Sequence, residues 1–332
     1  EVQTGCFDSF GAEWDRLLSG NPMPNAFLSR TWQKTWWDQF GGSSELRLIG
    51  FRDAGELVAL APLMARDGVI SFLGGTDLVD YHDILSTHHD CTAVAEELFC
   101  ALDRYDDWHT IDLGSLPNWS PYLEAFVSAA EKRGWGTTTE QEDVAPGVEL
   151  PPSWDEYLAG LRKKDRHELR RKMRRLEAAG ELEQRVFSTA SDIDANFNEF
   201  VRLHKLSTPE KNEFLTPERE SFFRTVTRYL AREGRVRMYF TSLSGVTVAT
   251  SLCHEVEGRR FVYNSGYDPE YSNLAVGLLN HALFIKNSIA EGISYVDFMR
   301  GNERYKYDLG AKDRIISRLV IQRRQESGLL RE

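Results

Sequence analysis

A strand, a loop and a helix follow one another late in the chain and would aim backbone donors at one place. The expected strand ends at Ser265, and the expected helix covers residues 274–290. The first turn of a helix carries unpaired N–H groups and the positive end of the helix dipole, which suits a phosphate. Ala275 and Gly277 are small enough to let an anion approach the backbone. The alternative is a plain connection in which Gly277 packs against the sheet.

Two cations flank a glycine after the next expected strand. Arg300, Gly301 and Lys306 come where that strand ends, and open sheets bind ligands beyond their strand ends. Arg300 could hold a phosphate or carboxylate with two hydrogen bonds, and Lys306 could act as a point charge. The alternative is a turn in which both cations form ion pairs with Asp297 and Glu303.

A histidine near the middle of the first half could act as a base. His82 lies between Tyr81 and Asp83, and an imidazole with a pKa of about 6.5 can take a proton from an amine or a hydroxyl. Neighbouring residues of an extended chain point to opposite sides, so Asp83 would not orient His82. A loop histidine without a catalytic role is the alternative.

One segment carries most of the positive charge. Residues 162–175 hold nine Lys or Arg against Asp165 and Glu168, a net of +7, so the rest of this −11 chain carries −18. Such a helix is either a solvated face with charge pairs four residues apart or a site for an anionic partner. The anion would be a polysaccharide, a lipid-linked sugar diphosphate, a membrane surface or RNA. No aromatic residue is interleaved to stack on bases, which disfavours RNA.

The elements that must position these residues occur in the same order twice. The first set is strands 46–52, 57–64 and 69–73, helix 92–105 and strand 109–113; the second is strands 236–241, 246–256 and 260–265, helix 274–290 and strand 294–299. Gly75 and Asp77 match Gly266 and Asp268 at one constant separation of 191 residues. The chain is therefore predicted to be internally duplicated.

Further helices surround the two sets. Aromatic residues at helical spacing predict two opening helices within residues 10–40. Ser153 and Glu156 form a capping box that predicts the start of one long helix ending at Gly180. Helices over residues 193–206 and 217–231 are expected before the second sheet, the last one starting with Pro217 behind Thr216.

Length and composition limit the classes of protein to which the chain can belong. The 332 residues, at 38.0 kDa, exceed one usual domain and predict two. The longest apolar run is too short to cross a membrane, and no signal sequence is visible at the start. The four cysteines form no CxxC pair, so neither a metal site nor a disulfide framework is expected. A reducing, cytoplasmic compartment is the simplest expectation.

The order of hairpin, strand, anion-binding loop, helix and strand resembles the GNAT acyltransferase fold. Two copies in one chain resemble the FemAB-like and CelD-like (cellulose biosynthesis) acetyltransferases, whose signature is similar to residues 295–306, YVDFMRGNERYK. Residues 263–268 and the Phe27-Leu28-Ser29 segment add to the resemblance. It implies an α/β fold of two tandem GNAT-like units, 1–150 and 151–332, each a mixed, mainly antiparallel sheet flanked by helices, with a cleft between them.

The resemblance implies acetyl-CoA as the acyl donor, bound by the second unit. Backbone N–H groups of the strand would bind the oxyanion, and the loop and helix start would bind the diphosphate. The implied donor site consists of Val262, Tyr263, Asn264, Ser265, Asn273, Leu274, Ala275, Val276 and Gly277. One departure affects this expectation: GNAT enzymes carry Arg/Gln-x-x-Gly-x-Gly/Ala, whereas residues 272–277 read SNLAVG.

The predicted reaction is acetyl transfer to an amine or hydroxyl of a cell-envelope or polysaccharide precursor by direct attack. The candidates for proton removal are Asp268, Asp297, Tyr305 and His82. The candidates for substrate binding are Tyr81, Tyr267, Arg300, Asn302 and Lys306. Two alternatives remain: an aminoacyl transferase that uses aminoacyl-tRNA, as in the FemAB branch, and a non-catalytic module that binds polyanions.

Overall fold

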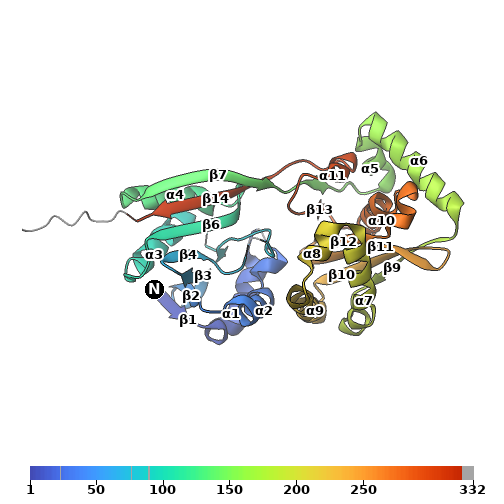
Figure 1. The fold of residues 1–332 in the computed structure, drawn as a ribbon. Coiled ribbons are helices and arrows are strands. Elements are labelled where there is room, and N and C mark those ends of the chain that lie inside the picture. The colour runs from blue at the N-terminus through green and yellow to red at the C-terminus, as the bar shows by residue number, and fades with distance from the viewer. Residues whose placement is uncertain (23, 76, 89, 324–332) are drawn as a thin grey trace, which may run out of the picture. The chain divides into compact units, whose positions relative to one another are not determined.

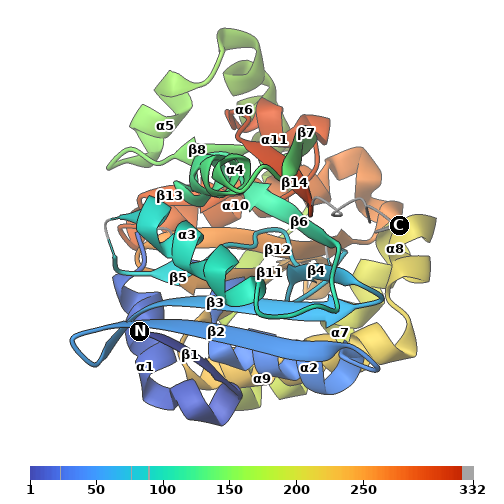
Figure 2. The same cartoon turned by 90° about the vertical axis from the view of Figure 1, so that its left-hand side faces the viewer.

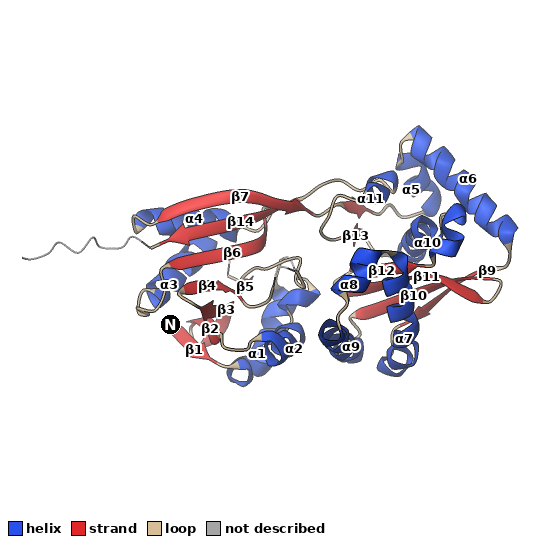
Figure 3. Ribbon diagram, in the orientation of Figure 1, coloured by secondary structure: helices blue, strands red, loops and turns tan. Residues whose placement is uncertain are grey.

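The computed structural model describes residues 1–22, 24–75, 77–88 and 90–323. The chain divides into two compact units, each built of helices and a sheet (Figures 1 and 3). The first unit is Glu1–Asp143 together with the segment from Arg314 onward, and the second is Val144–Asp313. This α/β architecture of two sheets flanked by helices confirms the predicted fold class.

The first sheet has the strand order β1-β2-β3-β4-β6-β14-β7, with β5 paired to β3. Its strands are β1 Val2–Gly5, β2 Glu45–Asp53, β3 Glu56–Arg66, β4 Val69–Phe72, β5 Leu85–Ser86, β6 Thr110–Pro117, β7 Gly136–Val144 and β14 Ile315–Gln322. The pairing of β4 with β6 is parallel, whereas β2, β3 and β4 form an antiparallel meander.

Helices cover this sheet on its apolar faces. They are α1 Phe7–Gly20, the short 3₁₀ helix η1 Ala26–Leu28, α2 Arg30–Phe40, α3 Cys91–Leu102 and α4 Tyr122–Lys132. Figure 2 shows α3 and α4 lying over strands of the first sheet, and Phe99 of α3 packs on Phe126 of α4 with ring centroids 5.8 Å apart. These two helices and the sheet enclose the core of the unit.

Strand β14 changes the domain boundary that the sequence predicted. The predicted boundary places residues 315–322 in the second unit, but β14 pairs antiparallel with β6 inside the first sheet. Conversely, the predicted boundary places β8 Gly147–Glu149 in the first unit, but β8 pairs with β13 of the second. Each unit therefore takes one strand from the part of the chain assigned to the other, because strand pairing follows hydrogen bonding and not chain order.

The second sheet has the order β8-β13-β12-β11-β10-β9. Its remaining strands are β9 Leu182–Phe187, β10 Val236–Leu243, β11 Val246–Val256, β12 Arg259–Tyr267 and β13 Tyr295–Asp297. Its helices are α5 Trp154–Gly160, α6 Lys163–Ala179, α7 Ala190–Ser207, α8 Pro209–Phe214, α9 Pro217–Arg232, the 3₁₀ helix η2 Pro269–Leu274, α10 Val276–Ala290 and α11 Arg304–Asp308. Helix α10 packs on one face of this sheet, and α7 and α9 lie on the other (Figure 1).

The predicted long helix after Ser153 is two helices. Ser153 caps α5 as expected, because its hydroxyl accepts a hydrogen bond from the Glu156 N–H at 3.2 Å. The chain then turns extended at Leu161 and Arg162, with ψ of 149° and 140°. Gly160 ends α5 and the Leu161 side chain is buried, so α6 starts in a new direction.

The two sheets share a register that explains the constant separation seen in the sequence. Arg66 pairs with Val69 in the first hairpin as Val256 pairs with Arg259 in the second, a separation of 190 residues. A β-bulge then adds one residue, Tyr263, to β12. Beyond the bulge the separation becomes 191, which is the offset at which Gly75 matches Gly266.

Two other features of the described residues are relevant to function. No helix is long and apolar enough to cross a membrane. The four cysteines are all free, and no group of three or more His, Cys, Asp or Glu side chains is arranged to hold a metal ion.

Candidate functional site

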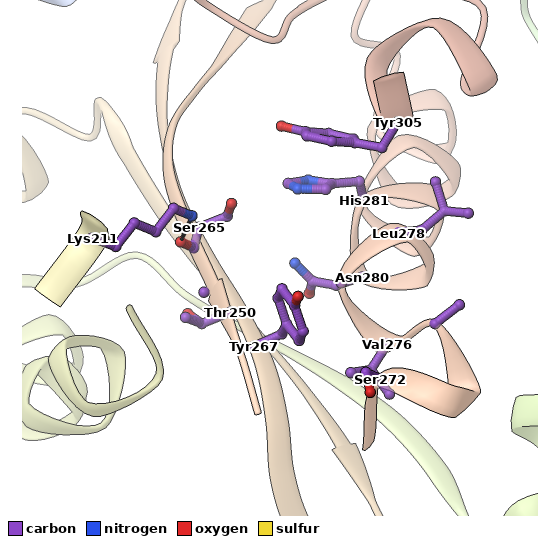
Figure 4. A pocket seen from close by; sticks show the side chains of 13 residues that line it. Lys211, Thr250, Ser265, Tyr267, Ser272, Val276, Leu278, Asn280, His281 and Tyr305 are labelled. Atoms are coloured by element: carbon purple, nitrogen blue, oxygen red, sulfur yellow. Dashed lines mark hydrogen bonds between the residues drawn. The ribbon is translucent and has the colours of Figure 1, made fainter. Parts of the chain in front are cut away.

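The second unit contains a pocket of about 290 Å³ between β12 and α10. Figure 4 shows side chains from the strand on one side and from the helix on the other, with Lys211 and Ser265 opposite the rings of His281 and Tyr305. The lining residues are Lys211, Thr250, Ser265, Gly266, Tyr267, Ser272, Ala275, Val276, Gly277, Leu278, Asn280, His281 and Tyr305. Among these described residues there is no carboxylate.

The pocket exists because two parallel strands separate. Strands β12 and β13 pair only at Arg259–Phe261 with Tyr295–Asp297. After this short ladder β12 continues to Tyr267, where it lines the pocket, while the chain leaves β13 in another direction. A split between parallel strands beside a helix start is where open α/β sheets bind ligands.

The start of α10 faces this pocket and has no side chain to cap it. Ala275, the residue before the helix, has the left-handed conformation with φ of 58° and ψ of 37°. This conformation favours glycine and costs an alanine about 1–2 kcal/mol. Ala275 stands where the GNAT motif has its first glycine, a residue that adopts the left-handed conformation without this cost.

Gly277 and Gly266 are needed for close packing. A Cβ atom on Gly277 would lie 3.0 Å from Cδ1 of the Tyr267 ring, inside the pocket. A Cβ atom on Gly266 would lie 2.5 Å from backbone atoms of Leu203 and His204 on α7. Gly266 thus allows α7 to lie directly on β12. Gly277 leaves the space in front of the first turn of α10 free of a side chain.

Buried polar side chains form the floor of the pocket. The Asn280 amide donates to the Ser251 hydroxyl at 2.6 Å, and its oxygen accepts from Thr241 at 2.9 Å. Gln184 on β9 donates to Thr241 at 3.1 Å. Since each of these groups has a partner, the network fixes the side chain of Asn280 without the cost of an unsatisfied polar atom.

Three titratable groups determine the electrostatics of the pocket. Burial lowers the pKa of Lys211 to about 8, and the same cause, with Lys211 and Lys306 nearby, lowers the pKa of His281 to about 3. Burial also raises the pKa of Tyr305, which stacks on His281 with centroids 4.9 Å apart. At neutral pH the imidazole and the phenol are therefore uncharged, and Lys211 is the group that titrates near physiological pH.

The predicted donor-site residues divide between the two faces of the sheet. Ser265, Ala275, Val276 and Gly277 line the pocket as expected, as does Tyr267. Val262 points to the α10 side but lies in the apolar core. The remaining members of the predicted set do not line the pocket: Tyr263, Asn264, Asn273 and Leu274.

The bulge explains why two of these residues point elsewhere. Tyr263 stacks on His254 at 4.9 Å and meets Phe223 of α9, and Asn264 lies 3.3 Å from the ring of His204 on α7. Both side chains therefore face α7 and α9, while their backbone is the bulged part of β12. A bulge leaves backbone groups outside the ladder, so the backbone of this stretch can still serve a ligand.

The predicted carboxylate bases hold backbone instead. Asp268 accepts a hydrogen bond from the Glu270 N–H at 3.0 Å and caps η2. Asp297 is buried and accepts from the Met299 N–H at 2.8 Å. Neither side chain lines the pocket, whereas Tyr305, the third candidate, does.

The predicted role of Lys306 is corrected by its contacts. Its ammonium is buried and donates to the carbonyl oxygens of Met299, Arg300 and Gly301 at 2.8–3.0 Å, and it pairs with Glu303 at 2.8 Å. An ammonium has three protons, so none remains for a substrate. Lys306 instead holds the turn after β13, in which Arg300 is half-buried and Asn302 is exposed.

The candidates Tyr81 and His82 belong to the first unit. Tyr81 is buried and packs edge-on against Phe27 and Trp119. The His82 ring is stacked on Phe72, and its Nδ1 donates to the Gly114 carbonyl at 3.0 Å. Tyr81 was a candidate for substrate binding, and its burial leaves little of its side chain accessible to a substrate.

The basic segment is helix α6, which packs against α10 and η2. Asp165 pairs with Arg162 at 2.5 Å, and Glu168 pairs with Arg171 at 2.7 Å and Lys172 at 3.6 Å. Five exposed cations of this helix have no carboxylate within 4.0 Å among the described residues: Lys163, Lys164, Arg170, Arg174 and Arg175. Positive charge therefore gathers beside the start of α10.

A second pocket, of about 340 Å³, connects this charge to the first pocket. It is lined by Lys164, Lys172 and Arg304, with Asp165, Glu168 and Asp308 among its other lining residues. Leu278 lines both pockets. The two cavities therefore adjoin at the first turn of α10.

The polar residues of the pocket that sequence patterns did not indicate are Lys211, Thr250, Asn280 and His281. Lys211 lies on α8, a helix that the sequence analysis did not predict. A signal was present, because Thr208 and Pro209 repeat the cap and first-turn proline that marked α9 at Thr216 and Pro217. The other three lie inside elements that were predicted, and only the fold turns them toward the cavity.

Comparison with known proteins agrees with this architecture. Residues 163–307 match the model of the acetyltransferase (GNAT) domain family. No curated protein matches the chain. Among solved structures, the chain is similar to FemX, with 12% identity, 96% of each chain covered and a TM-score of 0.65.

Two further structures have the same fold over the whole chain. L-PGS from Bacillus licheniformis is 12% identical, with 89% of this chain and 92% of that chain covered and a TM-score of 0.55. A tandem GNAT protein from the clavulanic acid biosynthesis pathway is 15% identical, with 98% and 99% covered and a TM-score of 0.50. At such low identity these likenesses show the fold alone.

The fold and the domain match define the class of protein. Residues 163–307 match the GNAT acetyltransferase domain, the whole chain has the fold of two GNAT-like units, and together these findings support an acyltransferase. The predicted resemblance is thereby confirmed as far as the GNAT superfamily and a FemX-like fold. The pocket described above lies inside the matched domain.

Proposed function

We propose that the protein transfers an acetyl group from acetyl-CoA to an amine or hydroxyl of a cell-envelope or polysaccharide-related acceptor. The observation that carries this proposal is the pocket at the split between β12 and β13, into which the uncapped start of α10 opens. This arrangement offers backbone N–H groups and a helix dipole to a diphosphate beside an apolar space for the acyl chain.

Direct acyl transfer depends mainly on the alignment of the donor and the acceptor. The acceptor attacks the thioester carbonyl directly while both substrates are bound, so most of the rate would come from holding them together. Backbone N–H groups around the β12 bulge would bind the oxyanion. Tyr305 lines the same pocket, and burial raises the pKa of its hydroxyl, so it would meet the bound substrates as an uncharged hydrogen-bonding group.

The start of α10 and the adjoining pocket would bind the phosphates of coenzyme A. The first turn of α10 would hold the diphosphate, with Gly277 allowing its close approach. In the adjoining pocket Lys172 and Arg304 pair with Glu168 and Asp308, and Lys164, which forms no ion pair among the described residues, would neutralise a further phosphate. The residues therefore fit coenzyme A in spite of the altered loop motif, because no side chain caps the start of α10 and its first N–H groups would be available to the diphosphate.

Calorimetry with acetyl-CoA tests the donor. Gly277→Trp puts an indole into the pocket and should abolish binding in the micromolar range. Gly136→Trp, the same change at an open position of β7, is the control and should bind as the wild type does. Failure of the wild-type protein to bind acetyl-CoA, or equal binding by the Gly277→Trp variant, would contradict the proposed donor site.

A second candidate is transfer of an aminoacyl group from aminoacyl-tRNA. The five exposed cations of α6 favour it, because they form no ion pair among the described residues, α6 packs on α10 and η2, and phosphate contacts supply most of the affinity for a nucleic acid. Salt titration of tRNA binding separates the two candidates. No affinity for acetyl-CoA, together with tRNA affinity that falls steeply with salt and is lost in Arg174→Ala and Arg175→Ala, would favour this candidate.

A further inference from the structure

We propose that Lys211 is a catalytic residue, which removes the proton from the attacking acceptor as a neutral amine inside the pocket. This inference rests on the proposed acyl transfer and supplies the proton acceptor that the fold and the motifs leave undefined. No sequence motif indicated this residue.

The position of Lys211 is fixed from two sides. The N–H of Lys211 is capped by the Thr208 hydroxyl at 3.3 Å, and the preceding Pro209 starts the short helix α8. The side chain then reaches β12, where its Nζ donates to the Ser265 carbonyl at 2.6 Å. Figure 4 shows this nitrogen at the strand side of the pocket, facing the rings of His281 and Tyr305 across it.

Lys211 lacks the partner that a structural lysine would have. Among the described residues no carboxylate oxygen lies within 4.0 Å of its Nζ, and Ser265 is its hydrogen-bond acceptor. The Lys211 nitrogen donates one N–H to the Ser265 carbonyl, and its remaining hydrogen-bonding positions face the pocket. A half-buried amine that keeps so few contacts is costly as a cation and suited to act as a base.

The other titratable groups of the pocket are less suited to this task. The pKa of His281, about 3, makes its imidazole a weak proton acceptor at neutral pH. Burial raises the pKa of Tyr305, so its hydroxyl keeps its proton. The carboxylates of Asp268 and Asp297 are engaged with backbone N–H groups outside the lining.

The charged and titratable groups around Lys211 come from four elements. Its own helix carries Glu210 and Glu213, α7 contributes His204, and α10 contributes His281. From the segment that ends in α11, the Lys306 cation opposes a second positive charge and the Glu303 carboxylate favours it. Burial outweighs these charges and lowers the pKa of Lys211 to about 8, so a large share of the residue is neutral slightly above physiological pH.

The proton and the bonds balance without a further reactant. As the acceptor nitrogen attacks, the C–N bond forms and the nitrogen gives its extra proton to the neutral Lys211 amine. The C–S bond then breaks, and the coenzyme leaves as a thiolate that takes the proton back from the Lys211 ammonium. The products are the acetylated acceptor and the free thiol, and Lys211 is neutral again.

The ionisation of Lys211 can be measured without an acceptor. Competitive labelling with acetic anhydride at a series of pH values, followed by mass spectrometry, gives the pKa of each lysine amine. Lys211 should be half-reactive near pH 8, well below the exposed lysines, and bound acetyl-CoA should protect it. A midpoint near that of the exposed lysines would overturn the inference, whatever the donor is.

Kinetics then separate a base from a fixed positive charge. Thiol release from acetyl-CoA is followed with a panel of primary amines for the wild type, Lys211→Met, Lys211→Arg and Lys205→Met. Lys205 lies on α7 and pairs with Glu220 at 3.0 Å, so its variant is the control and should keep wild-type rates. Both Lys211 variants should lose about 100-fold or more in kcat, because arginine stays protonated.

The pH profile and chemical rescue complete the test. Wild-type kcat/KM should rise with pH and level off above about pH 8, and added methylamine should restore part of the activity of Lys211→Met more strongly at higher pH. Wild-type rates in Lys211→Met, or near-wild-type rates in Lys211→Arg, would overturn the role of Lys211 while leaving acetyl transfer standing. Wild-type protein without thiol release for any amine would overturn both.

Discussion

The two units carry a crevice at the same point of their sheets, and the two crevices differ in what surrounds them. In the second unit β12 and β13 separate, and the start of α10 opens into a pocket of about 290 Å³. In the first unit β4 and β6 separate after Ser71 and Asp112, and a pocket of about 620 Å³ lies there. Both pockets follow from the same split of a parallel pair.

The first crevice is closed to an anion by its own chain. A loop brings His82 between the strands, where its backbone N–H donates to the Ser115 carbonyl at 2.9 Å and its ring stacks on Phe72. The next helix, α3, starts only at Cys91, far from the end of β4 at Phe72. Helix α10, in contrast, starts nine residues after the end of β12.

The charges of the two pockets are opposite. The described lining of the pocket in the first unit contains Asp112, Glu140 and Glu142 and one cation, Arg318. Arg318 donates to Asp112 at 2.6 and 2.8 Å. The described lining of the pocket between β12 and α10, in the second unit, has Lys211 and no carboxylate. The two units therefore share the split between strands, but side chains and loop length differ, and of the two pockets the one in the second unit has an uncapped helix start and a lysine in its described lining.

Acid should destabilise the second unit well before the first. Burial lowers the pKa of His204, His254 and His281 to about 3 each. The unfolded chain binds these protons below about pH 6.5 and the folded one only near pH 3. The free energy of unfolding therefore falls by about 1.4 kcal/mol per pH unit for each histidine between these values. Hydrogen exchange at pH 7 and pH 5 should show β10–β12 losing protection before β2 and β3.

His281→Phe sharpens this prediction. The phenyl ring keeps the stacking on Tyr305 but removes one titrating group, so the loss of protection on acidification should be smaller than in the wild type. An unchanged loss in this variant, or equal acid sensitivity of both units, would contradict the assigned cause.

The first unit should respond to pH in the opposite direction. Burial raises the pKa of Asp83 to about 7, although Ser120 donates to its carboxyl at 2.9 Å. The folded unit holds this proton while the unfolded chain releases it near pH 4, so stability is lost as pH rises between these values. Asp83→Asn should therefore stabilise the unit at pH 8 by a few kcal/mol at most, and give no gain at pH 4.

Asp106→Asn is the matched control, because Asp106 is exposed. Denaturant unfolding of both variants at the two pH values measures the difference. Equal effects of the two substitutions, or a gain from Asp83→Asn that does not depend on pH, would show that Asp83 does not titrate as inferred.

Equivalent glycines of the two crevices should differ in their tolerance of a methyl group. A Cβ on Gly266 meets backbone atoms of α7 at 2.5 Å, whereas a Cβ on the matching Gly75 meets the carboxylate end of Asp77 at 2.7 Å. Backbone cannot move aside and a side chain can, so Gly266→Ala should cost about 1–3 kcal/mol. Gly75→Ala should cost clearly less in the same unfolding experiment, and the reverse order would refute the packing argument.

The smallest expected effect concerns the loop before α10. Ala275→Gly relieves the left-handed conformation and should raise the free energy of unfolding by about 1 kcal/mol, with acetyl-CoA binding retained. Ala178→Gly, the same change at an exposed position of α6, should lower it by about 0.5–1 kcal/mol. A loss of stability in Ala275→Gly would mean that the loop does not need this conformation.

Much of each sheet could be predicted because its signals are local. The hairpin turns at residues 53–55, 67–68, 244–245 and 257–258 lie between alternating apolar runs, and the helices that follow have clear spacing. Strand β14 could not be placed, because residues 315–322 are a strand whose partner β6 lies some 200 residues away. Pairing over such a separation leaves no trace in local sequence.

The candidate site was predicted in part for the same reason. The helix start at Ala275 and Gly277 is a local pattern, and it does line the pocket. The contacts of Lys306 and the approach of Lys211 to Ser265 depend on how α8 and the turn after β13 fold over the strand. Residue types alone made Lys306 the expected ligand and left Lys211 without a role.

The position of β14 between β6 and β7 has a consequence for synthesis on the ribosome. The stretch Val144–Asp313 is continuous, so the second unit, which contains the segment that matches the GNAT domain, has all its strands as soon as it emerges. The earlier half must hold β6 and β7 as unpaired edges until Ile315–Gln322 arrives to join them. The part of the protein made first is therefore the part completed last, and a nascent chain halted near residue 313 would carry a complete second unit and a first sheet that still lacks β14.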